Sequence, residues 1–291
     1  MNNLIIVSSL KSAEYGSAHH PEGPERISKS YDFLQKTGEF TFIEPDINSC
    51  AEQDITKVHA KKMINMIKTG KFSDPNTPSL PNIYNYALLS AAAAVTAMKQ
   101  THENNSIAFS LMRPPGHHSS REKLGGFCYF NNIAIAIKKY LELKPAGKAA
   151  IIDIDCHHGN GTQDIFLGRK NVLYVSLHQV PLYPGTGLKS KENCLNYPLK
   201  AQTTEEEYLD TLKTALSKIR DFLPDLLGVS AGFDTYQGDP LAGMGLEVAS
   251  YAKIKELIVA INIPYFCVLE GGYSPELKYC VYEFIVEDIA T

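Results

Sequence analysis

The chain contains short, unbroken hydrophobic runs, and polar sequence that contains glycine follows each of them. The clearest runs are residues 109–112, 148–152, 226–230 and 266–269. Such runs are typical of parallel β-strands that are covered on both faces, because neither side of the strand then faces water. A buried helix could give the same pattern, but these runs span only four or five residues and are flanked by Gly or Pro. We therefore predict buried strands at these places.

Helical spacing of hydrophobic residues appears between the predicted strands. Thr203 or Thr204, with an acidic residue three positions on, forms a capping box, and leucines then repeat at helical spacing until Pro224. Residues 131–143 and 86–100 are also helical in pattern, whereas residues 70–83 are rich in Pro, Asn and Ser and read as a loop. Alternation of strands with helices predicts an α/β fold with a mainly parallel sheet and helices on both faces.

The polar segments that follow the four runs read RPPGHHSS, DIDCHHGNGTQ, AGFDTYQGDPL and EGGYS. In an open α/β sheet, ligands bind beyond the carboxyl ends of the parallel strands. The four loops are therefore expected to converge on one rim of the sheet.

Two carboxylates and two imidazoles crowd into six residues at the end of the run 148–152. In an extended segment Asp153, Asp155 and His157 project to one side, and such oxygen and nitrogen donors suit a divalent metal such as zinc. Asp234, after the third run, could complete a set with Asp155 and His157 and leave positions open for water and a substrate carbonyl. The alternatives are a loop of polar residues that favour turns and, for Asp234, a turn or cap aspartate.

The other two loops supply groups for acid–base chemistry. His117 and His118 follow the RPPG turn and could transfer protons, because imidazole titrates near neutrality. Tyr273, after Gly271 and Gly272, offers a phenol donor for a developing oxyanion. An isolated histidine pair can equally be structural. Together the four loops contain what metal-assisted amide hydrolysis requires.

Composition adds limits to this interpretation. The chain has 291 residues, 44% hydrophobic and 21% charged, with a net charge of −4. No linker, charge block or internal repeat divides it, so we expect one catalytic domain over residues 1–291. The mildly acidic net charge gives no excess of basic residues to bind phosphates, which argues against direct nucleic-acid binding. An acidic rim could still favour a basic peptide.

The cysteines, the first residues of the chain and the length of the apolar stretches bear on the cellular location. Six cysteines are scattered without CxxC spacing, as expected for small buried residues in a reducing compartment. The opening MNNLIIVSS has a four-residue apolar run and no basic segment, which predicts a first strand rather than a signal peptide. No stretch approaches the roughly 18 apolar residues of a membrane span. We therefore expect a cytoplasmic protein without a membrane partner.

These motifs resemble those of the zinc-dependent histone deacetylase and acetylpolyamine amidohydrolase superfamily. The similar segments follow the family's order along nearly the whole chain. They are HPEGPERI (20–27), RPPGHH (113–118), GFCYFNN (126–132), DIDCHHGNGTQ (153–163), SLH (176–178), YPGTG (183–187), GFDTYQGDPL (232–241) and EGGYS (270–274). The long motifs are specific, and the resemblance implies the arginase/deacetylase fold.

The resemblance also implies the roles of the ionisable residues. Asp155, His157 and Asp234 would bind Zn²⁺, with Fe²⁺ as the alternative inside the cell. His118 would be general base and then general acid, and Tyr273 would donate to the substrate carbonyl and the oxyanion. His117 would be an electrostatic partner paired with Asp153. A structural K⁺ would lie close behind the metal, at the positions Asp153, Asp155, His157, Ser176 and Leu177.

The resemblance further implies a narrow substrate tunnel. Gly126, Phe127 and Tyr183 match the walls that hold the methylenes of acetyl-lysine, and Gly271 and Gly272 let the backbone approach the substrate. Arg26 matches an arginine at an internal channel through which acetate would leave.

The sequence departs from the family pattern at three positions. Asn160 stands where some members have an aspartate paired with the second histidine, so His118 lacks a full negative charge beside it. Asn76 falls where lysine deacetylases place a rim aspartate, and Asp74 could replace it. Leu241 occupies the place of an acidic gatekeeper in a polyamine-selective relative, which favours acyl-lysine over acetylpolyamine.

We therefore expect a zinc-dependent deacetylase, a hydrolase of linear amide bonds that removes acetyl or related short acyl groups from lysine in a protein or peptide. Acetylpolyamine hydrolysis is the alternative within enzymes. A hypothesis outside enzymes is a catalytically silent scaffold that binds acyl-lysine. A further alternative is oxygen chemistry at iron, because one His and two carboxylates resemble an iron ligand set. The sequence carries no signal for an oligomeric state.

Overall fold

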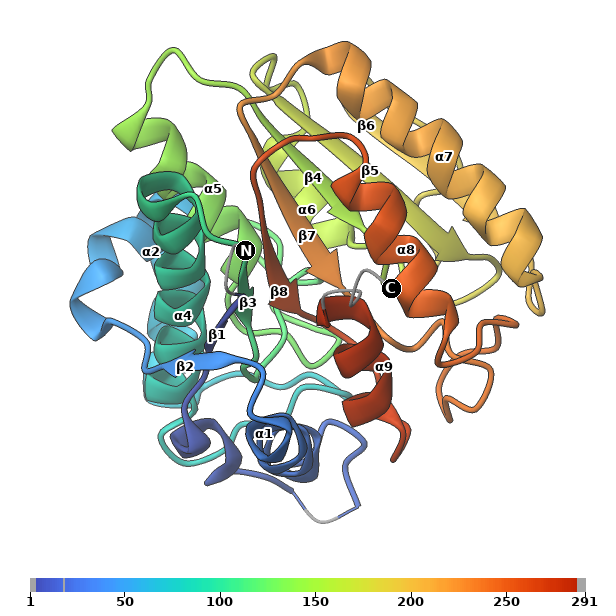
Figure 1. Ribbon diagram of the computed structural model, residues 1–291. Helices are drawn as coiled ribbons and strands as arrows, with labels where there is room; N and C mark the ends of the chain where they lie inside the picture. The colour runs from blue at the N-terminus through green and yellow to red at the C-terminus, as the bar shows by residue number, and fades with distance from the viewer. Residues whose placement is uncertain (1–3, 18, 287–291) are drawn as a thin grey trace.

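A parallel sheet forms the centre of the computed structural model, which describes residues 4–17 and 19–286. Within these residues the sheet has 8 strands in the order β2-β1-β3-β8-β7-β4-β5-β6, and every pairing is parallel (Figure 1). In that order the strands are β2 (Thr41–Ile43), β1 (Ile5–Val7), β3 (Ala108–Ser110), β8 (Tyr265–Leu269), β7 (Leu226–Ala231), β4 (Ala149–Asp153), β5 (Val172–Gln179) and β6 (Cys194–Leu199).

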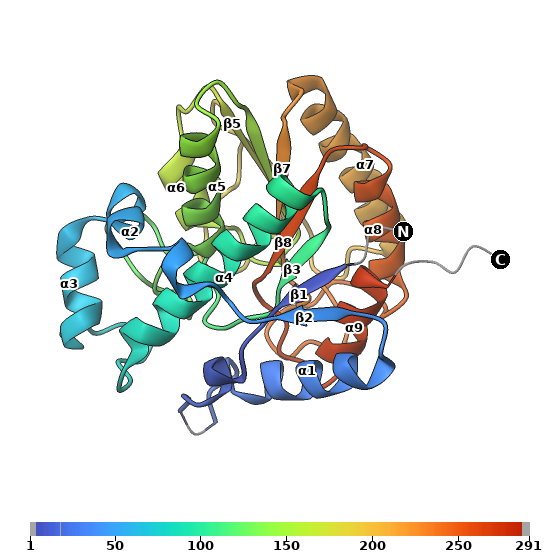
Figure 2. The ribbon, with the colours of Figure 1, turned by 60° about the vertical axis from the view of Figure 1, so that its left-hand side comes forward.

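Helices cover both faces of the sheet (Figures 1 and 2). One face carries α2 (Glu52–Val58), α3 (Lys61–Thr69), α4 (Ile83–Asn104), α5 (Asn132–Leu143) and α6 (Asn160–Phe166). The other carries α1 (Glu25–Thr37), α7 (Glu205–Phe222), α8 (Ser250–Val259) and α9 (Leu277–Ile285). Two short 3₁₀ turns, Leu10–Ala13 and Ile47–Ser49, complete the described elements.

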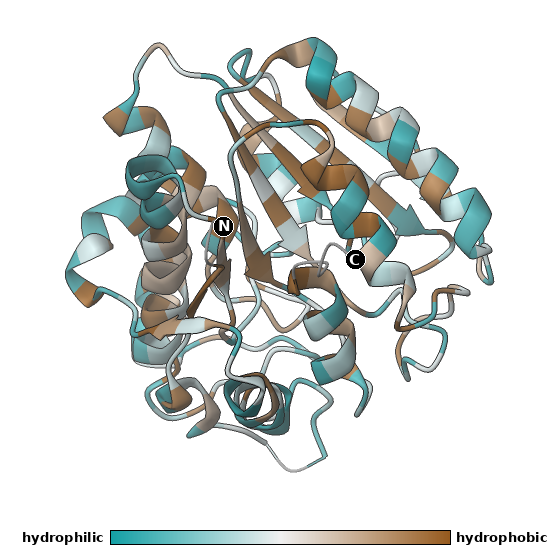
Figure 3. Cartoon of the chain, viewed as in Figure 1, coloured by the Kyte–Doolittle hydropathy of each residue, from teal (hydrophilic) through white to brown (hydrophobic). Residues whose placement is uncertain are grey.

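The hydrophobic core has two layers because successive residues of each strand point to opposite faces. In β4, Ile151 packs into the cluster that includes α4 and α5, and Ile152 packs into the cluster that includes α7 and α8. Figure 3 shows the central strands as brown along their length, with teal on the outer side of α7. Burial on both faces explains why the strands read as unbroken hydrophobic runs rather than as alternating sequence.

The predicted α/β fold with a parallel sheet is confirmed, and so are the four strands and the first strand at residues 5–7. The capping box of α7 is formed by Thr204 and Glu207, each of which accepts the other's backbone N–H, at 3.3 and 3.1 Å. The sequence reading did not identify the eight-residue β5 or the edge strand β6, which contains Pro198. Proline is tolerated in β6 because an edge strand leaves one row of N–H groups unpaired. In the described chain, no helix is long and apolar enough to cross a membrane.

The order of the strands decides where the polar loops meet. The four predicted strands are neighbours in the sheet, in the order β3-β8-β7-β4. Their carboxyl ends therefore lie side by side along one edge, and the loops that follow them share one rim. This edge carries the candidate site.

Candidate metal centre and active site

Asp155, His157 and Asp234 come together at the carboxyl edge of β4 and β7. Their donor atoms all lie within 4.8 Å of one another, and all three residues are buried. His157 Nδ1 is 3.1 Å from Asp155 Oδ1 and 2.7 Å from Asp234 Oδ2. Two carboxylates and one imidazole are donors that zinc and similar divalent ions take in proteins, so this donor set fits such an ion.

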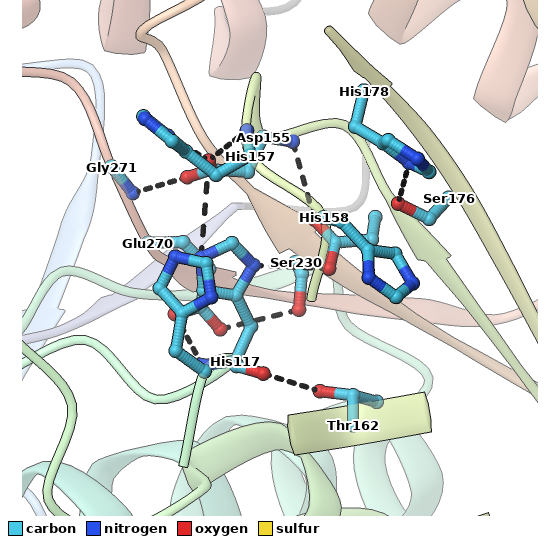
Figure 4. Close-up of polar contacts among 12 residues, drawn as sticks. His117, Asp155, His157, His158, Thr162, Ser176, His178, Ser230, Glu270 and Gly271 are labelled. Atoms are coloured by element: carbon cyan, nitrogen blue, oxygen red, sulfur yellow. Dashed lines mark hydrogen bonds and ion pairs between the residues drawn. The ribbon is translucent and has the colours of Figure 1, made fainter. Parts of the chain in front are cut away.

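Backbone N–H groups from two loops, the one after β4 and the one after β8, hold the two carboxylates in place. Asp155 accepts the N–H of Gly271 at 2.7 Å (Figure 4) and the N–H of His157 at 2.8 Å. Asp234 accepts the N–H of Cys156 at 2.7 Å. A Cβ atom on Gly271 would lie 2.5 Å from Oδ2 of both Asp155 and Asp234. Only glycine therefore lets the loop after β8 approach the carboxylates this closely.

The site concentrates negative charge where water does not reach. Burial, followed by the Asp155 charge, raises the pKa of Asp234 to about 7. Burial lowers the pKa of His157, but the charge of Asp234 outweighs it and raises that pKa to about 10. Buried carboxylates are costly unless a cation offsets their charge, so the electrostatics also fit a divalent ion at this place.

The adjacent histidines have different partners. His117 Nδ1 lies 3.1 Å from Asp153 Oδ2, which also accepts the Tyr174 hydroxyl at 2.9 Å. His118 Nδ1 lies 2.8 Å from the side-chain oxygen of Asn160. The two rings are 4.0 Å apart between centroids. The pairings expected for Asp153 and Asn160 are thus present as contacts.

These partners drive the two pKa values apart. Burial lowers the pKa of His117, but the charges of Asp155 and Asp153 outweigh this and hold it well above its usual range. Burial and the neighbouring charge on His117 hold the pKa of His118 well below its usual range. One imidazole is therefore set up as a cation and the other as a neutral base, because Asn160 brings no negative charge.

Glu270 is a buried carboxylate to which sequence reasoning gave no role. It accepts the N–H groups of Gly116, at 2.7 Å, and His117, at 3.1 Å, and the Ser230 hydroxyl at 3.2 Å. In Figure 4 its side chain overlaps His117, and a dashed line joins its carboxylate to Ser230. Burial raises its pKa to about 7. Its position directly after a buried strand, like that of Asp153 at the end of β4, was a signal that could have identified it.

Tyr273 lines a cavity of about 350 Å³, and His157 of the candidate metal cluster lines the same cavity. Its ring sits between the Arg26 guanidinium, 4.8 Å from the ring centroid, and Phe127, 5.5 Å away at 81°. Burial holds the pKa of its phenol well above the usual range, so the hydroxyl keeps its proton. The cavity is lined by His20, Pro21, Pro75, Asn76, His118, Gly126, Phe127, His157, Leu182, Tyr183, Leu241 and Tyr273.

The remaining candidate residues lie around this centre. Ser176 is the register partner of Asp153, and Leu177 follows it in β5. Arg26 donates to the carbonyl of Gly272 at 2.7 Å and lines a second cavity, of about 290 Å³, which Tyr273 also lines.

At the rim, Asp74 accepts the N–H of Asn76 at 3.0 Å. Its other carboxylate oxygen would lie 3.6 Å from a Cβ atom on Gly125, beside the hydroxyl of Tyr183. Asp74 and Asn76, the two residues considered for contact with the substrate backbone, therefore both lie at the rim of the cavity.

Fold and site together define an α/β protein with a candidate metal centre at the carboxyl edge of a parallel sheet, next to a histidine pair and a tyrosine. The chain belongs to the histone deacetylase family, because residues 20–287 match the histone deacetylase domain. Members of this family are deacetylases and amidohydrolases, which supports a hydrolase, and the family is generally metal-dependent.

Several relatives share this domain. A protein of Archaeoglobus fulgidus named "Probable deacetylase" is 34% identical over 89% of this chain and 78% of its own length. Acetylpolyamine amidohydrolase 2 of Pseudomonas aeruginosa is 36% identical over 70% of this chain, but the match spans only 62% of that protein.

Solved structures agree with the fold. The HD domain of HDA15 superposes with a TM-score of 0.90 and 26% identity, covering 98% of this chain and 87% of that one. Acetylpolyamine aminohydrolase from Burkholderia pseudomallei gives 0.87 and 26%, covering 97% of both chains. The predicted superfamily and fold are therefore confirmed.

Proposed function

We propose that this chain is a metal-dependent amidohydrolase that removes acetyl or related short acyl groups from lysine side chains. The observation that carries the proposal is the meeting of the Asp155, His157 and Asp234 cluster, the histidine pair and Tyr273 at one cavity. They come from the ends of four neighbouring strands, β3, β4, β7 and β8, and together they supply a metal site, a proton acceptor and a hydroxyl donor.

Asp155, His157 and Asp234 would hold the ion, and we favour Zn²⁺ with Fe²⁺ as the alternative. A divalent ion bound there would polarise a water molecule and the acyl carbonyl. A K⁺ behind it, at Asp153, Asp155, His157, Ser176 and Leu177, belongs to the same proposal.

His118 acts as the general base. Because Asn160 offers a carbonyl oxygen to Nδ1, the proton resides on Nδ1 and Nε2 is free to accept another. The low pKa of His118 keeps this ring neutral near pH 7. After the water attacks, the protonated His118 returns the proton to the leaving amine.

His117 and Asp153 stabilise charge rather than move the proton. The raised pKa of His117 favours its imidazolium form, whose positive charge would stabilise the negative charge that develops on the acyl oxygen. Glu270 fixes the backbone that carries both histidines by accepting the N–H groups of Gly116 and His117.

Tyr273 donates its hydroxyl proton in a hydrogen bond to the carbonyl oxygen and then to the tetrahedral oxyanion. Its raised pKa keeps the donor protonated near neutral pH. Such a preorganised donor stabilises the transition state more than the ground state.

The cavity walls support an acyl-lysine substrate. Gly126, Phe127 and Tyr183 line a passage suited to methylenes, and Leu241 places no carboxylate where a distal ammonium would need one. Asp74, held at the rim beside Tyr183, is available to accept backbone N–H groups of a peptide.

Acetylpolyamine hydrolysis is the second candidate, favoured by the amidohydrolase from Pseudomonas aeruginosa and by the aminohydrolase structure from Burkholderia pseudomallei. A catalytically silent acyl-lysine binder is disfavoured by the complete set of ligands, histidines and tyrosine.

A substrate panel tests the proposal. Purified protein of known metal content is assayed for amine and acetate release from acetyl-lysine peptides, longer acyl-lysine peptides, and acetylated putrescine and spermidine. We expect turnover of the peptides to exceed that of the polyamines. Polyamine turnover higher by tenfold would reverse the order of the two candidates, and peptide binding without acetate release from metal-loaded protein would establish the silent binder.

A further inference from the structure

The peptide group that joins Gly272 to Tyr273 is held from both ends. Arg26 Nε donates to the carbonyl of Gly272 at 2.7 Å, and the N–H of Tyr273 donates to Asp239 Oδ2 at 2.7 Å. Both bonds act on one rigid planar unit, so together they fix its orientation. Gly272 has a φ of 111°, where glycine has wide freedom, so these hydrogen bonds rather than side-chain sterics set the plane.

The same carboxylate makes a second backbone bond in another loop. Asp239 Oδ1 accepts the N–H of Leu241 at 2.9 Å. Asp239 is only 7% exposed, whereas Leu241 and Tyr273 both line the cavity of about 350 Å³. One buried side chain therefore ties the loop after β7, which carries Leu241, to the loop after β8, which carries Tyr273.

The position of the phenol depends on this tie. Arg26 lies over the Tyr273 ring and Phe127 packs against it at a steep angle, but the position of the ring also depends on the backbone from which it projects. A rotation of the Gly272–Tyr273 peptide would move the hydroxyl away from the metal cluster. Errors of about 1 Å in the placement of a group can cost about 100-fold in rate.

We infer that Asp239 is a positioning residue for the proposed reaction. Its carboxylate orients the Tyr273 hydroxyl toward the substrate carbonyl and holds Leu241 at a fixed position relative to Tyr273. This inference rests on the proposed function. Asp239 does not line the cavity and bonds to the backbone of Leu241 and Tyr273, so it acts through the tyrosine.

Graded variants separate this role from simple packing. Asparagine can accept only one of the two N–H groups, because its amide nitrogen is itself a donor, and alanine can accept neither. We expect kcat to fall about tenfold in Asp239→Asn and further in Asp239→Ala, with most of the loss in kcat rather than KM. Thermal unfolding shows whether each variant is folded, and elemental analysis shows whether it has bound the metal.

Asp225→Asn is the matched control. Asp225 also clamps backbone, accepting the N–H of Lys148 at 2.8 Å, but it lies just before β7, at the opposite end of the sheet. This variant is expected to keep the wild-type kcat.

A double-mutant cycle with Tyr273→Phe gives the decisive readout. If Asp239 acts through the phenol, Asp239→Asn should lower kcat less than twofold once that hydroxyl is gone. An equal loss in both backgrounds would overturn the inference, as would wild-type kcat in folded Asp239→Ala.

Amide hydrogen exchange tests the inference even if no acyl substrate is turned over, an outcome that would instead refute the proposed function. The amides of Leu241 and Tyr273 should exchange at least tenfold faster in Asp239→Ala than in the wild type and should be unchanged in Asp225→Asn. Unchanged protection of the Tyr273 amide in Asp239→Ala would overturn the inference.

Discussion

Replacing Asn160 with aspartate tests the assignment of His118 as general base. The amide oxygen of Asn160 lies 2.8 Å from His118 Nδ1, and the substitution puts a negative charge at nearly the same place without changing the side-chain size. The new carboxylate favours the imidazolium form of His118, so the pKa of His118 should rise from its lowered value.

The magnitude follows from the separation of the charges. Two unit charges about 4 Å apart interact by about 4 kcal/mol at an effective dielectric constant of about 20, or about 3 pKa units. Burial of the new carboxylate opposes this, and a shift of about 1 to 2 units is expected. Since His118 must be neutral to accept a proton, activity is present above its pKa and lost as the pH falls through it.

The assay is the pH profile of kcat/KM on an acetyl-lysine peptide. In Asn160→Asp the acid limb should move to higher pH by about 1 to 2 units, with activity retained on the plateau above it. Asn65→Asp adds the same charge at an exposed position of α3 and should leave the limb unmoved. An acid limb at the same pH in Asn160→Asp and wild type would refute the role of His118.

Three further substitutions test the other groups. Tyr273→Phe should lower kcat about 100- to 1,000-fold while metal content stays constant, and unaltered activity would remove Tyr273 from the mechanism. Asp234→Ala should lose the metal, so one retained equivalent by elemental analysis would eliminate Asp234 as a ligand. Leu241→Glu should raise the ratio of acetylspermidine to acetyl-lysine turnover by about tenfold, since it supplies a carboxylate for the distal ammonium; an unchanged ratio would show that the cavity wall does not select the substrate.

Much of the fold follows from local sequence because its strands are buried on both faces. The runs at β3, β4, β7 and β8 have no polar alternation that could confuse them with surface strands, and each ends in a loop with glycine. The edge strand β6 escaped this reading because its residues alternate in burial and include Pro198. Neither feature marks a strand without knowledge of its neighbours.

The candidate ligands were predictable because their residue types are costly to bury without a purpose. Asp155 and His157 stand two residues apart at a strand end, but their meeting with Asp234 depends on β4 and β7 being neighbours, which no local pattern specifies. The family motifs supplied that missing information.

The positioning contacts were not predictable from the sequence. Asp239 and Glu270 act by accepting backbone N–H groups from residues far along the chain, such as the 34-residue separation between Asp239 and Tyr273. Backbone donors leave no residue type in the sequence that would reveal such a partner. The prediction of a single catalytic domain over residues 1–291 stays a prediction.

The central claim is that distant segments gather around one cation that activates water against an amide. The most direct measurement is acetate release from an acetyl-lysine peptide while chelator-treated protein is reloaded with Zn²⁺ in steps. We predict that the rate rises linearly and stops at about one equivalent per chain, with no such rise in Asp234→Ala. Acetate release by the metal-free protein at the rate of the loaded protein would contradict the claim.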